Sequence, residues 1–306
     1  MRHLVDSAQL ATRDFDWILA TASGLKRSPQ TRPSALRGRI VALLFDQPSL
    51  RTRVSFEAAV LDLGGHALNL LPAEVGLGRR EEIEDVARVL SGYVDAVVLR
   101  SIHQELIDRF ALASTVPVIN GMSELWHPCQ GITDIFTIRE SLPSVQRPTI
   151  AFFGEAGAVS NSLMFTAAHA GMRIRLATPE QLRPRAELVD AARRVAADTG
   201  GAIEVLVDAQ AAAQNAEVLY TDSWRGTGRE LDASLRRALL RPYRVDAEML
   251  ARAATTAIVL HDLPAYRGDE ITADALDGPQ ARVLTQAANR VPVQEAILLW
   301  LFEGAR

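Results

Sequence analysis

The sequence has a single cysteine, Cys129, and only six histidines in 306 residues. One cysteine excludes a disulfide within the chain and a zinc site built from cysteines, and the scattered histidines show no metal-ligand spacing. Gly154-Glu-Ala-Gly157 lacks the third glycine of the dinucleotide-binding fingerprint. We therefore expect neither a metal nor an organic cofactor.

Long apolar runs and an excess of one charge are also missing. No apolar run reaches the length that spans a membrane, and the start, Met-Arg-His-Leu-Val-Asp-Ser, is a poor signal peptide. The formal net charge is −4 and the arginines are spread along the chain, which gives no support for nucleic-acid binding. We expect a cytoplasmic globular protein without membrane or nucleic-acid partners.

Short apolar runs alternate with amphipathic stretches along the whole chain. This alternation predicts the α/β class, with parallel sheets and helices on both faces of each sheet. The expected strands are Ile40–Phe45, Ala67–Leu71, Ala96–Leu99, Val116–Asn120, Thr149–Phe153, Arg173–Ala177, Ile203–Val207, Val218–Thr221 and Ala257–Leu260.

The segment Leu142-Pro-Ser-Val-Gln-Arg-Pro148 interrupts the pattern, and a fresh strand follows it. We therefore predict two doubly wound domains, residues 1–143 and 144–285. A C-terminal helix follows at 286–306.

The turn Ser49-Leu-Arg-Thr-Arg53 lies where the first strand hands over to a helix. Backbone N–H groups at a helix start, with hydroxyls and guanidinium groups beside them, form a site for an anion such as phosphate. An ordinary helix start with solvated arginines fits these residues equally well. We expect the buried face of this helix to contain Val54, Phe56, Ala58, Val60, Leu61 and Leu63.

Three segments together resemble the aspartate/ornithine carbamoyltransferase family, and its ornithine branch in particular: Ser49–Arg53, His127-Pro-Cys-Gln130 and His261-Asp-Leu-Pro264. The match continues in register through Leu99-Arg100, Phe153-Gly-Glu155, Tyr220-Thr-Asp-Ser-Trp224 and Asn289-Arg290.

The resemblance implies an enzyme that moves the carbamoyl group of carbamoyl phosphate to a small amine and releases phosphate. It implies an active site in the cleft between the two domains and a C-terminal helix that packs back on the first domain. It also implies a homo-oligomer, a trimer, in which the loop Val75–Arg80 reaches a neighbouring subunit. Gly76 stands where many members carry glutamine or lysine, with Arg79 and Arg80 close by.

The family pattern assigns the donor site residue by residue. Arg100 bridges phosphate and carbonyl oxygen, His127 donates to that oxygen, and Gln130 contacts the carbamoyl amide. With Arg51 these form the expected catalytic set. The full expected carbamoyl-phosphate site is Ser49, Leu50 (through its backbone), Arg51, Thr52, Arg100, His127, Gln130, Leu263 (through its carbonyl) and Arg290.

The acceptor site departs from the ornithine pattern. Ala158 replaces an asparagine, Asp262 replaces a cysteine, and Arg225-Gly-Thr-Gly228 replaces Ser-Met-Gly. The expected acceptor residues are Ala158, Asp222, Arg225, Gly226, Thr227, Asp262 and Leu263. Because lost hydrogen-bond partners cost roughly 1–3 kcal/mol each, we favour an acceptor other than ornithine, either an amino acid or a diamine.

Two alternatives stay open. One is an authentic ornithine carbamoyltransferase that forms citrulline. The other is a catalytically weak homologue that binds carbamoyl phosphate. Retention of the donor residues, the carbonyl-polarising His127 among them, speaks against the second.

Overall fold

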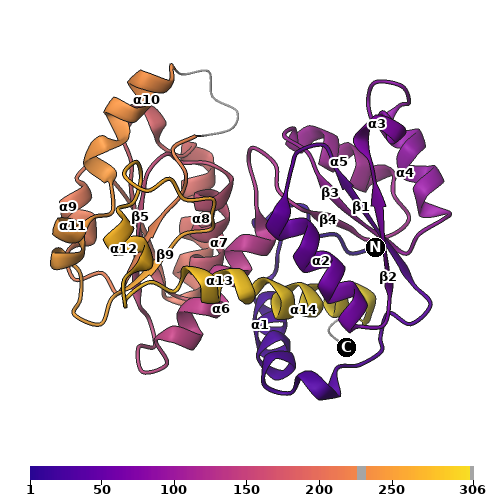
Figure 1. The fold of residues 1–306 in the computed structure, drawn as a ribbon, viewed down its shortest axis with the longest axis horizontal. Helices are drawn as coiled ribbons and strands as arrows, with labels where there is room; N and C mark the ends of the chain where they lie inside the picture. The colour runs from indigo at the N-terminus through magenta and orange to yellow at the C-terminus, as the bar shows by residue number, and fades with distance from the viewer. Residues whose placement is uncertain (226–231, 304–306) are drawn as a thin grey trace. The chain divides into compact units, whose positions relative to one another are not determined.

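The computed structural model describes residues 1–225 and 232–303. The packing of residues divides the chain into two compact units (Figure 1). Unit 1 contains residues 1–129 and 290–303, and unit 2 is drawn from residues 130–289. The domain limits expected at 143 and 285 stay a prediction.

In the described part of unit 1, four strands form a parallel sheet in the order β2-β1-β3-β4. Phe45, the last residue of β1, lies opposite Arg100, the last residue of β3. The carboxyl ends of the two central strands therefore meet at one edge. The strands are β1 (Ile40–Phe45), β2 (His66–Leu70), β3 (Ala96–Arg100) and β4 (Val118–Asn120).

Helices cover this sheet because its central strands are apolar on both faces. Helices α4 (Ile83–Ser91) and α5 (Gln104–Ala113) pack on one face through Ile83, Ile107 and Phe110. The other helices of unit 1 are α1 (Thr12–Arg27), α2 (Leu50–Asp62), α3 (Pro72–Val75) and α14 (Arg290–Glu303), with a 3₁₀ turn at Pro29–Thr31. Helix α14 packs against α1 and α2.

The buried face of α2 differs from the expectation. Phe56, Val60 and Leu63 are buried as predicted, but Val54 is 53% and Leu61 72% exposed. The buried positions recur at intervals of three and four residues from Thr52, which is the helical period. Thr52 therefore belongs to the buried stripe, and hydrophobicity alone misplaced its edges.

In the described part of unit 2, five strands form a second parallel sheet in the order β7-β6-β5-β8-β9. They are β5 (Thr149–Phe153), β6 (Arg173–Ala177), β7 (Ala202–Leu206), β8 (Val218–Thr221) and β9 (Ile258–Leu260). All nine predicted strands are present with ends shifted by at most a few residues. The predicted α/β class with two parallel sheets is confirmed.

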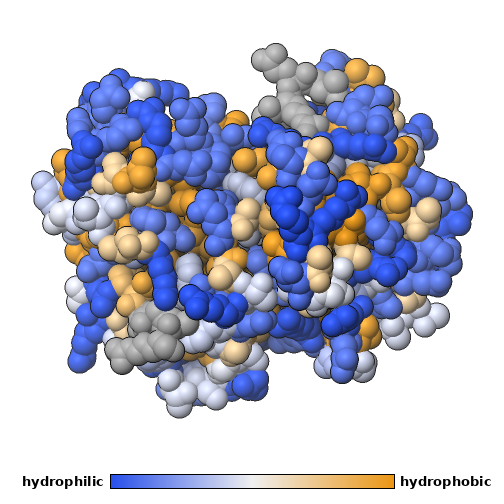
Figure 2. Space-filling view, turned by 180° about the vertical axis from the view of Figure 1, so that it is seen from behind, coloured by the Kyte–Doolittle hydropathy of each residue, from blue (hydrophilic) through white to orange (hydrophobic). Residues whose placement is uncertain are grey.

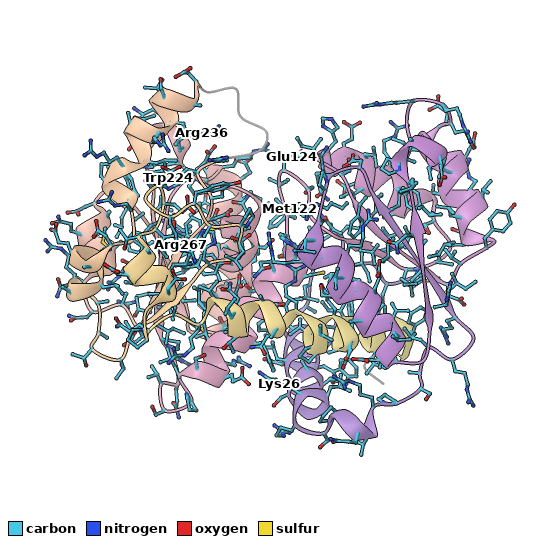
Figure 3. The ribbon with its side chains drawn as sticks, viewed as in Figure 1. Lys26, Met122, Glu124, Trp224, Arg236 and Arg267 are labelled. Atoms are coloured by element: carbon cyan, nitrogen blue, oxygen red, sulfur yellow. The ribbon has the colours of Figure 1, made fainter. Side chains whose placement is uncertain are left out.

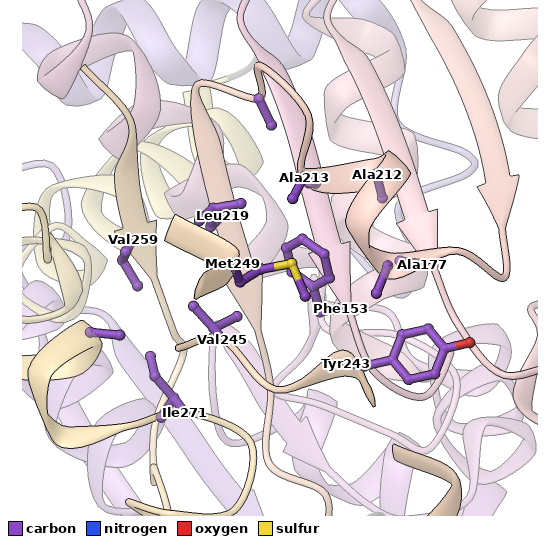
Figure 4. Packing of buried hydrophobic residues seen from close by; sticks show 14 of the residues in the cluster. Phe153, Ala177, Ala212, Ala213, Leu219, Tyr243, Val245, Met249, Val259 and Ile271 are labelled. Carbon is purple, nitrogen blue, oxygen red and sulfur yellow. The ribbon is translucent and has the colours of Figure 1, made fainter. Parts of the chain in front are cut away.

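The helices of unit 2 are α6 (Pro128–Ser141), whose first residues belong to unit 1, α7 (Ala158–His169), α8 (Ala186–Thr199), α9 (Ala209–Ala213), α10 (Ala233–Leu240), α11 (Ala247–Arg252), α12 (Ala273–Asp277) and α13 (Val283–Ala288). Two 3₁₀ turns lie at Glu180–Leu182 and Arg241–Tyr243. In the core, the thioether of Met249 lies beside the ring of Phe153 (Figure 4).

The surface seen in Figure 2 is mostly hydrophilic, with small separate apolar areas. Within residues 1–225 and 232–303, no helix combines the length and the apolar character needed to cross a bilayer.

A buried carboxyl group, Glu295, lies on α14 between two charged residues of unit 1. Its Oε1 is 2.9 Å from Nε of Arg32. Nη2 of the same arginine is 3.6 Å from Oδ2 of Asp62. Burial raises the pKa of Glu295 to about 7; Asp62 raises it further, and Arg32 opposes the shift. The folded chain therefore holds this proton more tightly than the unfolded chain does.

This raised pKa predicts a pH-dependent stability. The contribution of Glu295 is complete below about pH 4.5, the ordinary glutamate value, and is lost as the pH rises through about 7. Glu295→Gln mimics the protonated form, so its unfolding temperature should fall less than that of the wild type across this range. Thermal unfolding at several pH values measures this, with exposed Glu248→Gln as control. Parallel wild-type and Glu295→Gln profiles would contradict the assignment.

Candidate active site

Helix α2 begins at Leu50, directly after the turn that follows β1. Ser49 occupies the N-cap position, but its hydroxyl makes no capping hydrogen bond. The first backbone N–H groups of a helix have no partner within the helix and carry the positive end of its dipole. Leu50, 74% exposed, offers only its backbone here. The turn is suited to an anion.

Arg290 joins this turn from the other end of the chain. It is the first residue of α14, is buried, and donates from Nη2 to Oγ1 of buried Thr52 at 2.8 Å. The predicted donor residues Thr52 and Arg290, 238 positions apart, are therefore in contact.

Arg100 lies at the same edge of the sheet, at the end of β3. Its Nη1 donates to the carbonyl of Gly121 at 3.3 Å. A Cβ added to Gly121 would lie 3.3 Å from Cβ of Arg100, so glycine leaves room for this side chain.

The loop after β4 leads into His127 and is tightly held (Figure 3). Met122 has φ of 132°, which L-residues rarely adopt, and its N–H donates to Oδ1 of Asn120 at 2.8 Å. Ser123 Oγ donates to Oε1 of Gln104 at 2.6 Å. These bonds fix the backbone before His127, which is itself buried.

His127 is surrounded by positive charge. Burial lowers its pKa well below the usual histidine value, and Arg290, Arg100 and Arg51 lower it further. A neutral imidazole can still donate one hydrogen bond. The anion cluster of unit 1, which we define as Arg51, Thr52, Arg100, His127 and Arg290, thus combines three guanidinium groups with an uncharged donor.

Gln130, in the first turn of α6, belongs to unit 2. It is buried, and its Nε2 donates to Oδ1 of Asp134 at 2.8 Å. The same oxygen accepts from Nε2 of Gln286 at 2.7 Å.

The segment 261–264 follows β9 and is also held by buried groups. The N–H of His261 donates to Oε1 of Gln286 at 3.0 Å, and His261 Nδ1 accepts from the N–H of Leu263 at 2.8 Å. Nε2 of His261 lies 3.2 Å from Oε1 of buried Glu270. Because Nδ1 accepts, the ring proton is on Nε2 and points to Glu270. The Leu263–Pro264 peptide is cis.

Asp222 and Asp262 form a hydrogen-bonded carboxyl pair in unit 2. Burial raises the pKa of Asp222 well above the usual range, and the charge and hydrogen bond of Asp262 raise it further. The cause is that two adjacent buried negative charges repel each other.

The remaining acceptor candidates are only partly placed. Ala158 is a buried methyl at the first position of α7 and offers no amide. The guanidinium of Arg225 lies 3.6 Å from the ring centre of Tyr266, a cation–π contact. Gly226 and Thr227 lie outside the described residues. Beyond them, buried Arg236 on α10 pairs with Glu155 at 3.3 Å (Figure 3).

Sequence reasoning assigned no role to the supporting residues of unit 2. Asp134, Tyr220, Glu270 and Gln286 are all buried around the predicted residues. Gln130 and Asp134 are spaced four apart on one helix, a signal that could have paired them. No sequence signal connects Gln286 to either segment.

Gly76 ends α3 with φ of 64°. A Cβ at this position would lie 2.7 Å from Cβ of Arg80, so a larger residue requires the loop to shift. Arg80 pairs with Glu81 at 2.7 Å.

The anion cluster predicts binding of inorganic phosphate. A ligand that binds only the folded state raises the unfolding temperature. Arg51→Gln should remove most of the rise that phosphate gives the wild type, whereas Arg88→Gln, an exposed arginine on α4, should keep it. Thermal unfolding with and without phosphate measures this. Equal protection of Arg51→Gln and wild type would remove Arg51 from the site.

Two family models match the chain. Residues 2–140 match the carbamoyl-phosphate-binding domain of aspartate/ornithine carbamoyltransferase, and residues 146–301 match the Asp/Orn-binding domain of the same family. The first range contains Arg51, Arg100 and His127; the second contains Asp222 and Asp262.

Individual relatives agree over nearly the full length. An ornithine carbamoyltransferase from Parafrankia sp. is 43% identical over 99% of this chain and 96% of its own length. One from Methanoculleus marisnigri is 43% identical over 95% of this chain and 94% of its own length. The structure of the ornithine carbamoyltransferase from Pyrococcus furiosus superimposes with a TM-score of 0.95 at 37% identity, covering 100% of this chain and 98% of that one. The chain belongs to the aspartate/ornithine carbamoyltransferase family and is an enzyme of the carbamoyltransferase type.

Proposed function

We propose that this enzyme transfers the carbamoyl group of carbamoyl phosphate to the side-chain amine of ornithine and releases phosphate. The observation that carries the proposal is the anion cluster, in which neutral His127 lies among Arg51, Arg100 and Arg290. A doubly charged phosphate and a polarisable carbonyl on one small molecule require this combination.

The phosphate of the donor is assigned to the N-terminus of α2 with Arg51 and Thr52. Arg100 and His127 are assigned to the carbonyl oxygen, where negative charge develops as the amine attacks. Donors already aimed at that charge are among the largest contributions to catalysis. The low pKa of His127 suits it to donate without exchanging a proton.

The chemical step is balanced without a further reactant. The unprotonated amine nitrogen forms a bond to the carbonyl carbon, and the bond from that carbon to the phosphate oxygen breaks. The departing phosphate takes the proton that the nitrogen loses. The protein contributes position and charge, and positioning alone supplies on the order of 7–11 kcal/mol in favourable cases.

The relatives support ornithine rather than the other amine that the sequence suggested. Proteins that carry the name ornithine carbamoyltransferase are 43% identical to this chain over nearly its whole length, which favours ornithine as acceptor. Loss of a single amide at Ala158 is compatible with ornithine if neighbouring groups bind the acceptor in its place. Formation of citrulline from ornithine and carbamoyl phosphate tests the proposal directly; absence of product, with phosphate still bound, would support the weak-homologue alternative.

His127 provides the sharpest test of the donor site. His127→Gln keeps the size but changes the donor, and we expect kcat to fall by about 10²–10³-fold, as for other oxyanion donors. The histidine is already neutral, so the pH dependence of kcat should keep its shape. If kcat of the wild type falls at low pH and this acidic limb disappears in the variant, His127 is instead a proton acceptor.

Asp262 tests the acceptor site. Its side chain is 11% exposed and hydrogen-bonded to Asp222, so the pair can receive an ammonium group. Asp262→Asn should raise the KM for ornithine at least about tenfold, the loss expected for a charged hydrogen bond, and leave the KM for carbamoyl phosphate within about twofold. Asp198→Asn, exposed on α8, is the control. If both KM values keep their wild-type ratio, Asp262 does not contact the acceptor.

We also propose a homotrimer, supported by the family membership. Light scattering should then give about three times the chain mass of 33.3 kDa. A fully active monomer would exclude a subunit-sharing role for the loop that contains Gly76 and Arg80.

A further inference from the structure

Gln286, on α13, uses its whole amide group in the interior of unit 2. Its Nε2 donates to Oδ1 of Asp134 at 2.7 Å and to the hydroxyl of Tyr220 at 3.1 Å. Its Oε1 accepts from the N–H of His261 at 3.0 Å. The exposed fraction of Gln286 is 1%. A reversed amide would place oxygen against the Asp134 carboxylate and nitrogen against a backbone N–H, so this orientation is unique.

One branch of this network leads to Gln130. Asp134 Oδ1 accepts from Nε2 of Gln130 at 2.8 Å as well as from Gln286. An amide whose nitrogen is turned to a carboxylate has its oxygen turned away from it. Oε1 of Gln130 therefore faces away from Asp134. An amide oxygen can accept two hydrogen bonds, and it is the atom of Gln130 that can accept from the NH₂ of a carbamoyl group.

The other branch leads to Leu263. Gln286 holds the backbone of His261, whose Nδ1 accepts from the N–H of Leu263 at 2.8 Å. Glu270 holds the opposite ring nitrogen of His261. Both sides of the ring are thus fixed, and with them the N–H of Leu263. The carbonyl of the same residue, in the following Leu263–Pro264 peptide, belongs to the proposed donor site.

We propose that Gln286 is a positioning residue that fixes two hydrogen-bond acceptors for the carbamoyl NH₂ relative to each other. These acceptors are Oε1 of Gln130 and the carbonyl oxygen of Leu263. Through them Gln286 sets the preference of the enzyme for carbamoyl phosphate over acyl phosphates that lack this NH₂. The inference rests on the proposed function, because it uses the assignment of both acceptors to the donor.

A general loss of structure and a loss of positioning have different consequences. The anion cluster lies in unit 1, and Gln286 lies in unit 2. Binding of inorganic phosphate should therefore survive when Gln286 is replaced. Only the part of donor affinity that depends on the NH₂ should be lost.

Isothermal titration with inorganic phosphate, fresh carbamoyl phosphate and acetyl phosphate separates these parts. Two hydrogen bonds to the NH₂ should give the wild type a preference of about 5- to 150-fold for carbamoyl over acetyl phosphate. In Gln286→Met, which keeps length without hydrogen bonds, the preference should fall to within about threefold of unity. Phosphate affinity should change less than about twofold. Gln280→Met, which removes an amide bonded to the carbonyl of Ala257, is the matched control.

Asp134→Asn is the second variant. This variant retains the shape of the side chain but weakens the hydrogen bonds to the amides of Gln130 and Gln286, so part of the preference for carbamoyl over acetyl phosphate should be lost. If Gln286→Met does not fold, this variant provides the test. An unchanged preference in a folded variant overturns the inference while citrulline formation by the wild type leaves the proposed function intact. A wild type without preference for carbamoyl phosphate also overturns the inference, whereas only absence of citrulline formation overturns the proposed function.

Discussion

The hydrogen bond from Arg290 to Thr52 is the contact on which the anion cluster depends. It joins the start of the last helix to the first turn of α2, across 238 positions of sequence. Both side chains are buried, so the bond is shielded from water and the guanidinium is held in one place. After burial itself, Arg290 is the charge that lowers the pKa of His127 most. Without α14 packed into unit 1, the cluster would lack both an arginine and the influence that helps keep His127 neutral.

Unit 2 solves a different electrostatic problem. Asp134, Asp222 and Asp262 all act on buried Tyr220 and, after burial itself, raise its pKa. The chain accommodates these acids with amide donors from Gln130 and Gln286 to Asp134, and with a raised pKa at Asp222, which burial and the neighbouring Asp262 favour. Buried charges are tolerated only when hydrogen bonds or shared protons compensate for lost water. The same bonds fix the side chains that a small substrate would meet.

The two halves suit two kinds of substrate group. Unit 1 gathers guanidinium groups and helix N–H donors, which match an anion. Unit 2 gathers carboxyl groups, which match an ammonium. Arg51, Arg100 and His127 lie in the range of the family model described as carbamoyl-phosphate binding, whereas Asp222 and Asp262 lie in that of the Asp/Orn-binding model. Arg290 lies in the range of the second model but packs in unit 1.

The nine strands and the α/β class follow from local apolar runs, because a strand buried on both faces must be apolar along its length. The turn Ser49–Arg53 and the segment His127–Gln130 were recognisable because their chemistry is contiguous in sequence. Partners that meet only after folding were not. Gln286 bonds to Asp134 across 152 positions, and α2 turned Val54 outward although its residue type predicted burial. Which amide faces which carboxylate, and which stripe of a helix is covered, depends on packing between distant segments, and only the tertiary structure decides it.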